Sequence, residues 1–332
     1  MVFKRLLGSL GVGGPTVDTV LDPGAALPGG SLTGQVRLKG GDADFTIEQI
    51  GLELVGRVEV EHEEGESEGG VAFERFAVGG GFRLAAGADH SVPFQLTLPW
   101  ETPVTELHGQ PLGVVLGVRT ELAVAGAKDK GDLDPLAVRP LPVQEAVLQA
   151  LGQLGFGFRS ADLEYGRIRG TSQQLPFYQE IELAPAPQYA HAFQEIEVTF
   201  LASPGGVDVV LEADKRGGLF SEGHDAVVLH TVAHDGVELR DWNAEVDSWM
   251  RQLAERHGHF GGHGGHGGHH AAGHHSGHHS GHEPEHRSGH GMGGAVAAGA
   301  AGLAVGVVGG MAAAEAIDEI GDFFEGEEED EG

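Results

Sequence analysis

Cysteine is absent from the sequence, and basic residues are scarce. The lack of cysteine excludes disulfide bonds, thiolate catalysis and cysteine-bound zinc. It is also compatible with a reducing compartment, so we expect a cytoplasmic protein. Lys and Arg together number 20 against 50 acidic residues, which gives a formal net charge of −30. Because nucleic-acid binding needs clusters of Lys and Arg that neutralise phosphates, we expect no nucleic-acid partner.

Common catalytic motifs are also missing from the sequence. There is no nucleophile elbow, no phosphate-binding loop and no HExxH helix. The glycine-rich segment 11–14 has no strand before it, so it does not fit a dinucleotide-binding fingerprint. The N-terminal apolar stretch is broken by glycines and has no convincing cleavage site, so we expect no secretory signal. These absences predict a protein that is not an enzyme and requires no cofactor.

What the sequence does contain is hydrophobic alternation with a period of two. In Ser31–Leu38, apolar residues and glycine alternate with Thr, Gln and Arg, which is typical of a strand with one solvated face. Similar short segments recur between turn-forming residues, and this pattern favours an all-β fold built from sandwiches. The segments are 31–38, 45–60, 71–78, 91–98, 113–125, 155–164, 179–183, 194–201, 207–213 and 227–233.

Three segments show helical spacing instead. Residues 143–154 and 241–255 carry apolar residues at steps of three and four, and residues 3–10 can form a short amphipathic helix. The stiff connector 139–142 suggests a domain boundary. We therefore expect two β-sandwich domains with short helices at the N-terminus, at the domain junction and at the end of the second domain. The expected domains cover residues 1–138 and 139–256, followed by a His/Gly-rich disordered linker over 257–290 and a Gly/Ala-rich segment with an acidic tail over 291–332.

Acidic residues gather at several places within the expected domains. Residues 61–70 are interpreted as an acidic loop between two strands. Asp129, Asp132 and Asp134 lack the spacing of a calcium-binding loop, so a turn at the domain boundary is the favoured interpretation. Asp208, Glu212 and Asp214 are interpreted as the solvated side of a strand.

The histidine-rich linker is the candidate metal site of the sequence. Neutral imidazole binds nickel, zinc and copper, and a flexible glycine-rich chain can place several rings around one ion. A solvated spacer is the alternative, and a fixed tetrahedral zinc site is disfavoured because the tract lacks ordered supporting groups. The candidate nickel or zinc ligands are His263, His266, His269, His270, His274, His275, His278, His279 and His282.

The uncharged segment 291–314 is long enough to cross a bilayer, but its glycines and alanines contribute little transfer energy. Its small residues are spaced for close helix packing. Self-association or peripheral membrane contact is therefore favoured over a spacer or a membrane span, and the N-terminal helix can contribute to that contact. The acidic residues over 315–331 are interpreted as a solvated end of the chain.

Several segments in order resemble the sporulation-control M family of bacterial arrestin-like regulators. The matching text includes LPGGSLTGQVRLKGG from Leu27, VPFQLTLPWETPV from Val92, PFYQEIELAP from Pro176 and LEADKR from Leu211. The resemblance covers about residues 1–250. It implies two arrestin-like sandwiches in tandem and a regulatory role in sporulation, and it carries over no catalytic residues. The family's boundary segment, usually Asp-rich, is matched only in part by residues 128–134.

The resemblance and the composition together predict a regulatory protein that acts through protein–protein contacts. The expected partners are proteins of the sporulation or cell-division machinery. The alternatives are a metal-handling protein that uses the His-rich linker, and a membrane-associated scaffold that uses the Gly/Ala-rich segment.

Overall fold

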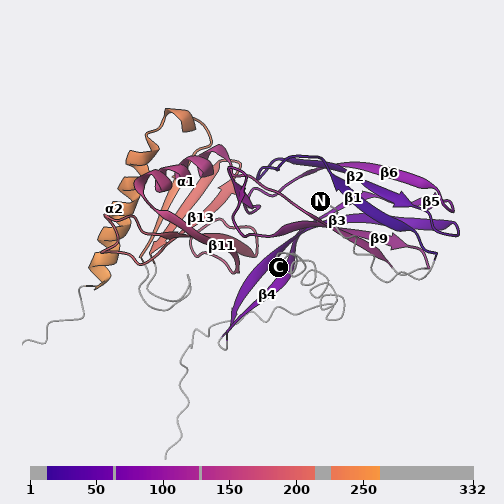
Figure 1. Ribbon diagram of the computed structural model, residues 1–332, viewed down its shortest axis with the longest axis horizontal. Helices are drawn as coiled ribbons and strands as arrows, with labels where there is room; N and C mark the ends of the chain where they lie inside the picture. The colour runs from indigo at the N-terminus through magenta and orange to yellow at the C-terminus, as the bar shows by residue number, and fades with distance from the viewer. Residues whose placement is uncertain (1–12, 63–64, 127–128, 214–225, 262–332) are drawn as a thin grey trace, which may run out of the picture.

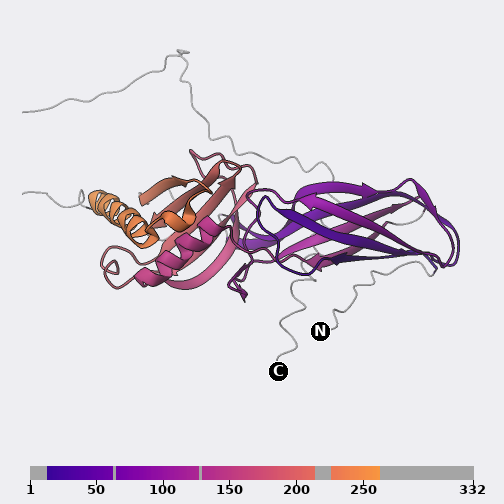
Figure 2. The ribbon, with the colours of Figure 1, turned by 90° about the horizontal axis from the view of Figure 1, so that it is seen from above.

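The computed structural model describes residues 13–62, 65–126, 129–213 and 226–261. They form a mainly β structure with two α-helices, arranged as two lobes along an elongated molecule (Figures 1 and 2). The first lobe contains β1–β10 and the second contains α1, β11–β15 and α2. A sheet of three strands and a sheet of ten strands make up most of the structure. The mainly β character and both domain helices predicted from the sequence are therefore confirmed.

The first lobe places a small antiparallel sheet in the order β1-β2-β6 against part of the large sheet (Figure 1). Leu32, Val36 and Leu38 of β2 are buried, which confirms the predicted alternation of this strand. Thr19 of β1 connects the two sheets, because its hydroxyl lies 2.6 Å from the hydroxyl of Thr120 on β9. The strands of this lobe are β1 (Thr16–Leu21), β2 (Ser31–Lys39), β3 (Phe45–His62), β4 (Gly65–Gly79), β5 (Phe82–Leu84), β6 (Asp89–Thr97), β7 (Glu106–Leu107), β8 (Gln110–Pro111), β9 (Leu116–Val124) and β10 (Lys130–Pro135).

Strand β3 joins the two lobes. It is 18 residues long, and it pairs with β5, β4 and β9 within the first lobe. Near its end, Glu59 is the register partner of Glu164 on β11 in a parallel pairing. The large sheet therefore runs without interruption from β10 in the first lobe to β15 in the second. We refer to the β3–β11 pairing as the seam.

The second lobe is an antiparallel meander of five strands whose inner face is covered by the two helices (Figure 1). Trp249 of α2 stacks on His230 of β15 with ring centroids 4.5 Å apart, and His230 is the register partner of Val209. Val209 and its neighbours on that face are buried under α2. The elements are α1 (Pro142–Leu154), β11 (Gly157–Tyr165), β12 (Phe177–Ala184), β13 (Ile196–Ser203), β14 (Gly206–Ala213), β15 (Ala226–Val232), the short 3₁₀ helix η1 (Val237–Leu239) and α2 (Trp242–Gly261).

Local sequence explains where helix α1 begins and ends. Pro142 occupies its first turn, where a missing backbone N–H costs nothing. The Gln144 side chain accepts a hydrogen bond of 2.8 Å from the backbone N–H of Leu141. Gly155 ends the helix with φ of 97°, a left-handed conformation that favours glycine. The predicted helix over 143–154 is thus confirmed almost to the residue.

Three interpretations of acidic segments are wrong. The segment 61–70 is not a loop throughout, because β4 begins at Gly65 and pairs with the end of β3. The residues from 130 to 135 do not form a turn but the edge strand β10, which pairs with β9. Glu212 is not solvated, since its residue is 4% exposed. Sequence alternation places it on the outer face correctly, but that face is covered.

Two further expectations concern segments that lie partly or wholly outside the described residues. The predicted helix over 3–10 and residues 262–332 lie outside them. Helix α2 continues through Gly261, so its last turn includes the first residues of the segment assigned to the His-rich linker. Among the described helices, none combines the length and apolar character needed to cross a bilayer.

Candidate functional site

The outer face of the second lobe, opposite the helices, carries an unusual concentration of carboxylates. The register places Glu182 beside Glu197, and Glu197 beside Glu212, across three neighbouring strands. Asp162 on β11 is likewise the register partner of Glu180 on β12. Like charges directly opposite each other destabilise a sheet. This arrangement therefore requires protons, a bound cation or basic side chains to compensate the charge.

Asp162, Glu164 and Glu180 form the tightest part of this face, which we call the carboxylate cluster. One carboxylate oxygen from each lies within 4.8 Å of the others. Glu180 is 6% exposed, and no described residue donates a hydrogen bond to its Oε1 atom. Burial, followed by the charges of Glu197 and Asp162, raises the pKa of Glu180 to about 10.

Apolar and aromatic side chains exclude water beside the carboxylate cluster. Ile168, Tyr178, Leu201 and Val210 are buried together on the same outer face. Burial and then the neighbouring glutamates raise the pKa of the Tyr178 hydroxyl. Because low-dielectric surroundings strengthen electrostatic effects, the remaining charge of the carboxylates is poorly screened here.

Gln173 fixes the loop that carries Ile168 over this face. Its side-chain oxygen accepts a hydrogen bond of 2.8 Å from the backbone N–H of Ile168. Its amide nitrogen donates to the carbonyl oxygens of Gly166, Leu175 and Phe177. The buried amide thus holds the loop between β11 and β12 in one conformation.

A second pair of carboxyl groups lies where β10 meets β1. The backbone N–H of Thr19 donates a hydrogen bond of 2.6 Å to Asp132. Burial, the neighbouring charges of Asp132 and Asp18, and a hydrogen bond with Asp132 together raise the pKa of Asp134 to about 8. Burial also raises the pKa of Asp132. The pair can therefore hold a proton at neutral pH.

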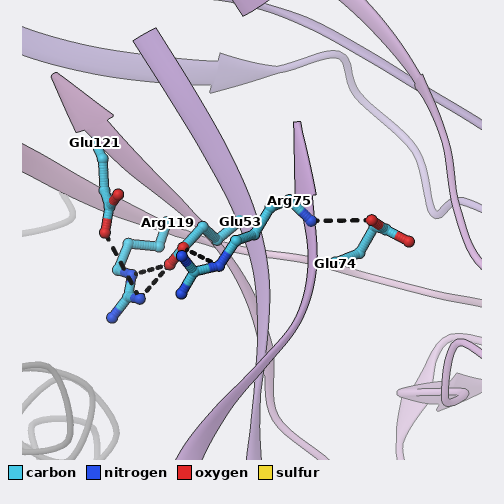
Figure 3. Close-up of polar contacts among 5 residues, drawn as sticks. All are labelled: Glu53, Glu74, Arg75, Arg119 and Glu121. Carbon is cyan, nitrogen blue, oxygen red and sulfur yellow. Dashed lines mark hydrogen bonds and ion pairs between the residues drawn. The ribbon is translucent and has the colours of Figure 1, made fainter. Parts of the chain in front are cut away.

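A third polar group holds β4 onto the sheet. The carboxylate of Glu53 on β3 accepts hydrogen bonds from Arg119 on β9 and forms an ion pair of 2.7 Å with Arg75 on β4 (Figure 3). The Glu53 side chain is 3% exposed, whereas that of Arg75 is 73% exposed. Glu121 approaches the outer side of Arg119. The buried carboxylate is thus compensated by two guanidinium groups, and this contact is structural.

Strand β4 presents a long edge of the large sheet. In Figure 1 the far ends of β3 and β4 extend away from the first lobe, beneath the seam. Among the described strands, β4 pairs with β3 alone. None of its described side chains, from Ser67 to Gly79, is buried. Phe73 anchors the strand to the second lobe, because its ring lies edge-on to Phe177 at 5.4 Å.

The nine histidines proposed as nickel or zinc ligands (His263, His266, His269, His270, His274, His275, His278, His279 and His282) all lie outside the described residues. Their role stays a prediction. The carboxylate cluster was missed by the sequence analysis. Its signal was present as acidic residues two positions apart, Asp162 with Glu164 and Glu180 with Glu182, but this spacing is also typical of a solvated strand face. Burial of that face separates the two interpretations.

Comparison with known proteins gives a consistent result. Residues 3–217 match the family described as SpoOM protein. The sporulation-control protein spo0M of Bacillus subtilis (strain 168) is 32% identical over 262 residues, which cover 77% of this chain and 98% of that protein. The crystal structure of Spo0M from the same organism matches with a TM-score of 0.64 and 29% identity, over 74% of this chain and 100% of the other.

Proposed function

The chain belongs to the Spo0M family of sporulation-control proteins, and we propose that it is a non-enzymatic regulator that binds partner proteins through the edge of β4. Family membership supports a role in sporulation control. The proposed partners belong to the sporulation or cell-division machinery. The proposed location is the cytoplasm, and residues 291–314 are proposed to contact the membrane surface as an additional element.

We further propose that the two lobes correspond to tandem arrestin-like domains with their boundary at the connector before α1. The small sheet that faces the large sheet in the first lobe supports this assignment. The five-stranded meander after α1 supports a second unit, although its inner face is covered by helices rather than by another sheet.

The edge of β4 is the observation that carries the proposed mechanism. An edge strand exposes backbone N–H and C=O groups that can pair with an extended segment of another chain, and this mode of recognition is called β-augmentation. Strand β4 spans 15 residues and has no strand on its outer side among the described residues. The Glu53 ion pairs and the Phe73–Phe177 contact hold it rigidly, which reduces the entropy lost on binding.

Replacing small residues on β4 with lysine tests this mechanism, because lysine on an edge strand opposes pairing with another chain. Ala77 is exposed, and Gly69 has open space where a Cβ atom would lie, so Gly69→Lys and Ala77→Lys are expected to fold. We expect the double variant to lose at least tenfold in affinity for its partner and to fail to restore sporulation in a host strain that lacks the gene.

Ala86→Lys is the matched control, because Ala86 is exposed in the turn between β5 and β6. It is expected to behave as the wild type. A photo-crosslinking residue at position 77 is expected to capture a partner protein, whereas the same residue at position 86 is not. If the β4 variants restore sporulation and keep the same crosslinks as the control, then the edge of β4 is not the docking site.

A further inference from the structure

We propose that Asp162, Glu164 and Glu180 form a binding site for a hard divalent cation, with calcium as the favoured ion. This site is independent of the proposed docking edge, and it lies on the opposite side of the second-lobe sheet from the helices. Asp162 and Glu164 belong to β11, the strand that forms the seam with β3. Glu180 belongs to β12, so a bound ion would tie the seam strand to its neighbour.

The distances within the carboxylate cluster fit calcium. Calcium binds oxygen ligands at about 2.3–2.6 Å, so two oxygens on one ion lie at most about 5.2 Å apart. The three carboxylate oxygens are within 4.8 Å of one another. Magnesium binds at about 2.0–2.1 Å and demands near-ideal octahedral geometry, so calcium, which tolerates irregular coordination, is the favoured ion. Carboxylates alone are a donor set suited to calcium, magnesium or manganese rather than to nickel or copper.

Glu180 provides a second, independent observation. Its side chain is aimed into the cluster from the buried side, and its Oε1 atom has no hydrogen-bond donor among the described residues. Buried carboxylates are normally paired or bound to a metal, because desolvating an uncompensated charge is costly. A cation between Glu180 and the two β11 carboxylates would satisfy this atom.

Nearby glutamates strengthen the same attraction. Glu197 and Glu212 lie close enough to Glu180 to act on it electrostatically. Two arginines of this lobe have partners outside the cluster: Arg159 pairs with Glu195, and Arg167 donates to the carbonyl oxygens of Gln173 and Gln174.

Terbium(III) gives a test that reports the location of the ion. It replaces calcium at oxygen sites, and its emission is strongly enhanced when a nearby aromatic ring transfers energy to it. Tyr178 follows the same face two residues before Glu180 and is the register partner of Glu164. We expect terbium emission on excitation of the full-length protein, competition by calcium, and a loss of most of the emission in Tyr178→Phe with calcium affinity retained.

Substitution of the ligands tests the binding itself. Glu180→Gln keeps the shape of the side chain and removes its charge, so it is expected to fold and to bind calcium at least tenfold more weakly in calorimetric titration. Glu48→Gln is the matched control, because it removes one exposed carboxylate from the first lobe. The His-rich linker does not interfere, because imidazole is a poor ligand for calcium.

Three outcomes would overturn the proposal. One is equal calcium affinity in the wild type and Glu180→Gln, and another is terbium emission that survives in Tyr178→Phe. The third concerns Lys215 and Arg216, which follow β14 in the sequence and lie outside the described residues. If the wild type binds no calcium, the proposal fails. Calcium binding gained in Lys215→Gln/Arg216→Gln would then show that basic side chains of the chain itself compensate the cluster.

Discussion

Replacing Asp134 with asparagine is expected to flatten the pH dependence of stability. The folded protein raises the pKa of Asp134 to about 8, mainly through burial, from an ordinary value near 3.8. Between these two values the folded chain holds a proton that the unfolded chain has released. The contribution of Asp134 to the free energy of unfolding is therefore fully present below about pH 4 and is lost as the pH rises towards 8.

The size of the effect follows from linkage. One retained proton changes the free energy of unfolding by about 1.4 kcal/mol per pH unit, or about 2.7 kcal/mol between pH 5 and pH 7. Asp134 is only half-buried, so solvent screening reduces this value, and we expect about 1–1.5 kcal/mol. Over this interval the wild type should lose that much more stability than Asp134→Asn.

Urea denaturation of both proteins at pH 5, 6 and 7 measures this difference directly. Groups that are not coupled to Asp134 cancel in the comparison, and Asp89→Asn, which removes an exposed carboxylate on β6, serves as the control. Parallel curves for the wild type and Asp134→Asn would refute the reasoning. The reasoning would also be refuted if the wild type gained stability relative to Asp134→Asn as the pH rises, because the difference would then have the opposite sign.

Other perturbations are expected to have distinct effects. Arg119→Met leaves the buried Glu53 carboxylate with Arg75 alone and should cost about 3 kcal/mol in urea denaturation, most of which Glu53→Leu/Arg119→Met should recover. Phe177→Ala should cost about 3–5 kcal/mol, because the ring is 1% exposed and supports Phe73; an effect below 1 kcal/mol would contradict this packing. Deleting residues 262–290 should abolish nickel binding in calorimetry and leave the melting temperature unchanged, and nickel affinity that persists would place the site elsewhere.

The sequence by itself predicted most of the longer strands and both α-helices of the described residues, but not the edge strand β10. Alternation over 31–38 and 207–213, and helical spacing over 143–154, are local properties of amphipathic elements. Each such element buries one face whatever its partner is. The family resemblance also came from local text, such as the segments after Leu27 and Pro176, and the comparisons confirm it.

Only the tertiary structure decided which strands meet and which polar faces are covered. The parallel pairing of Glu59 with Glu164 depends on contacts between residues far apart in the chain, and no local period encodes it. The same holds for Glu180 and Glu212: their spacing places them on an outer face, but a loop and neighbouring strands bury that face. Alternation specifies the side of a strand on which a residue lies, whereas burial depends on what packs against that side.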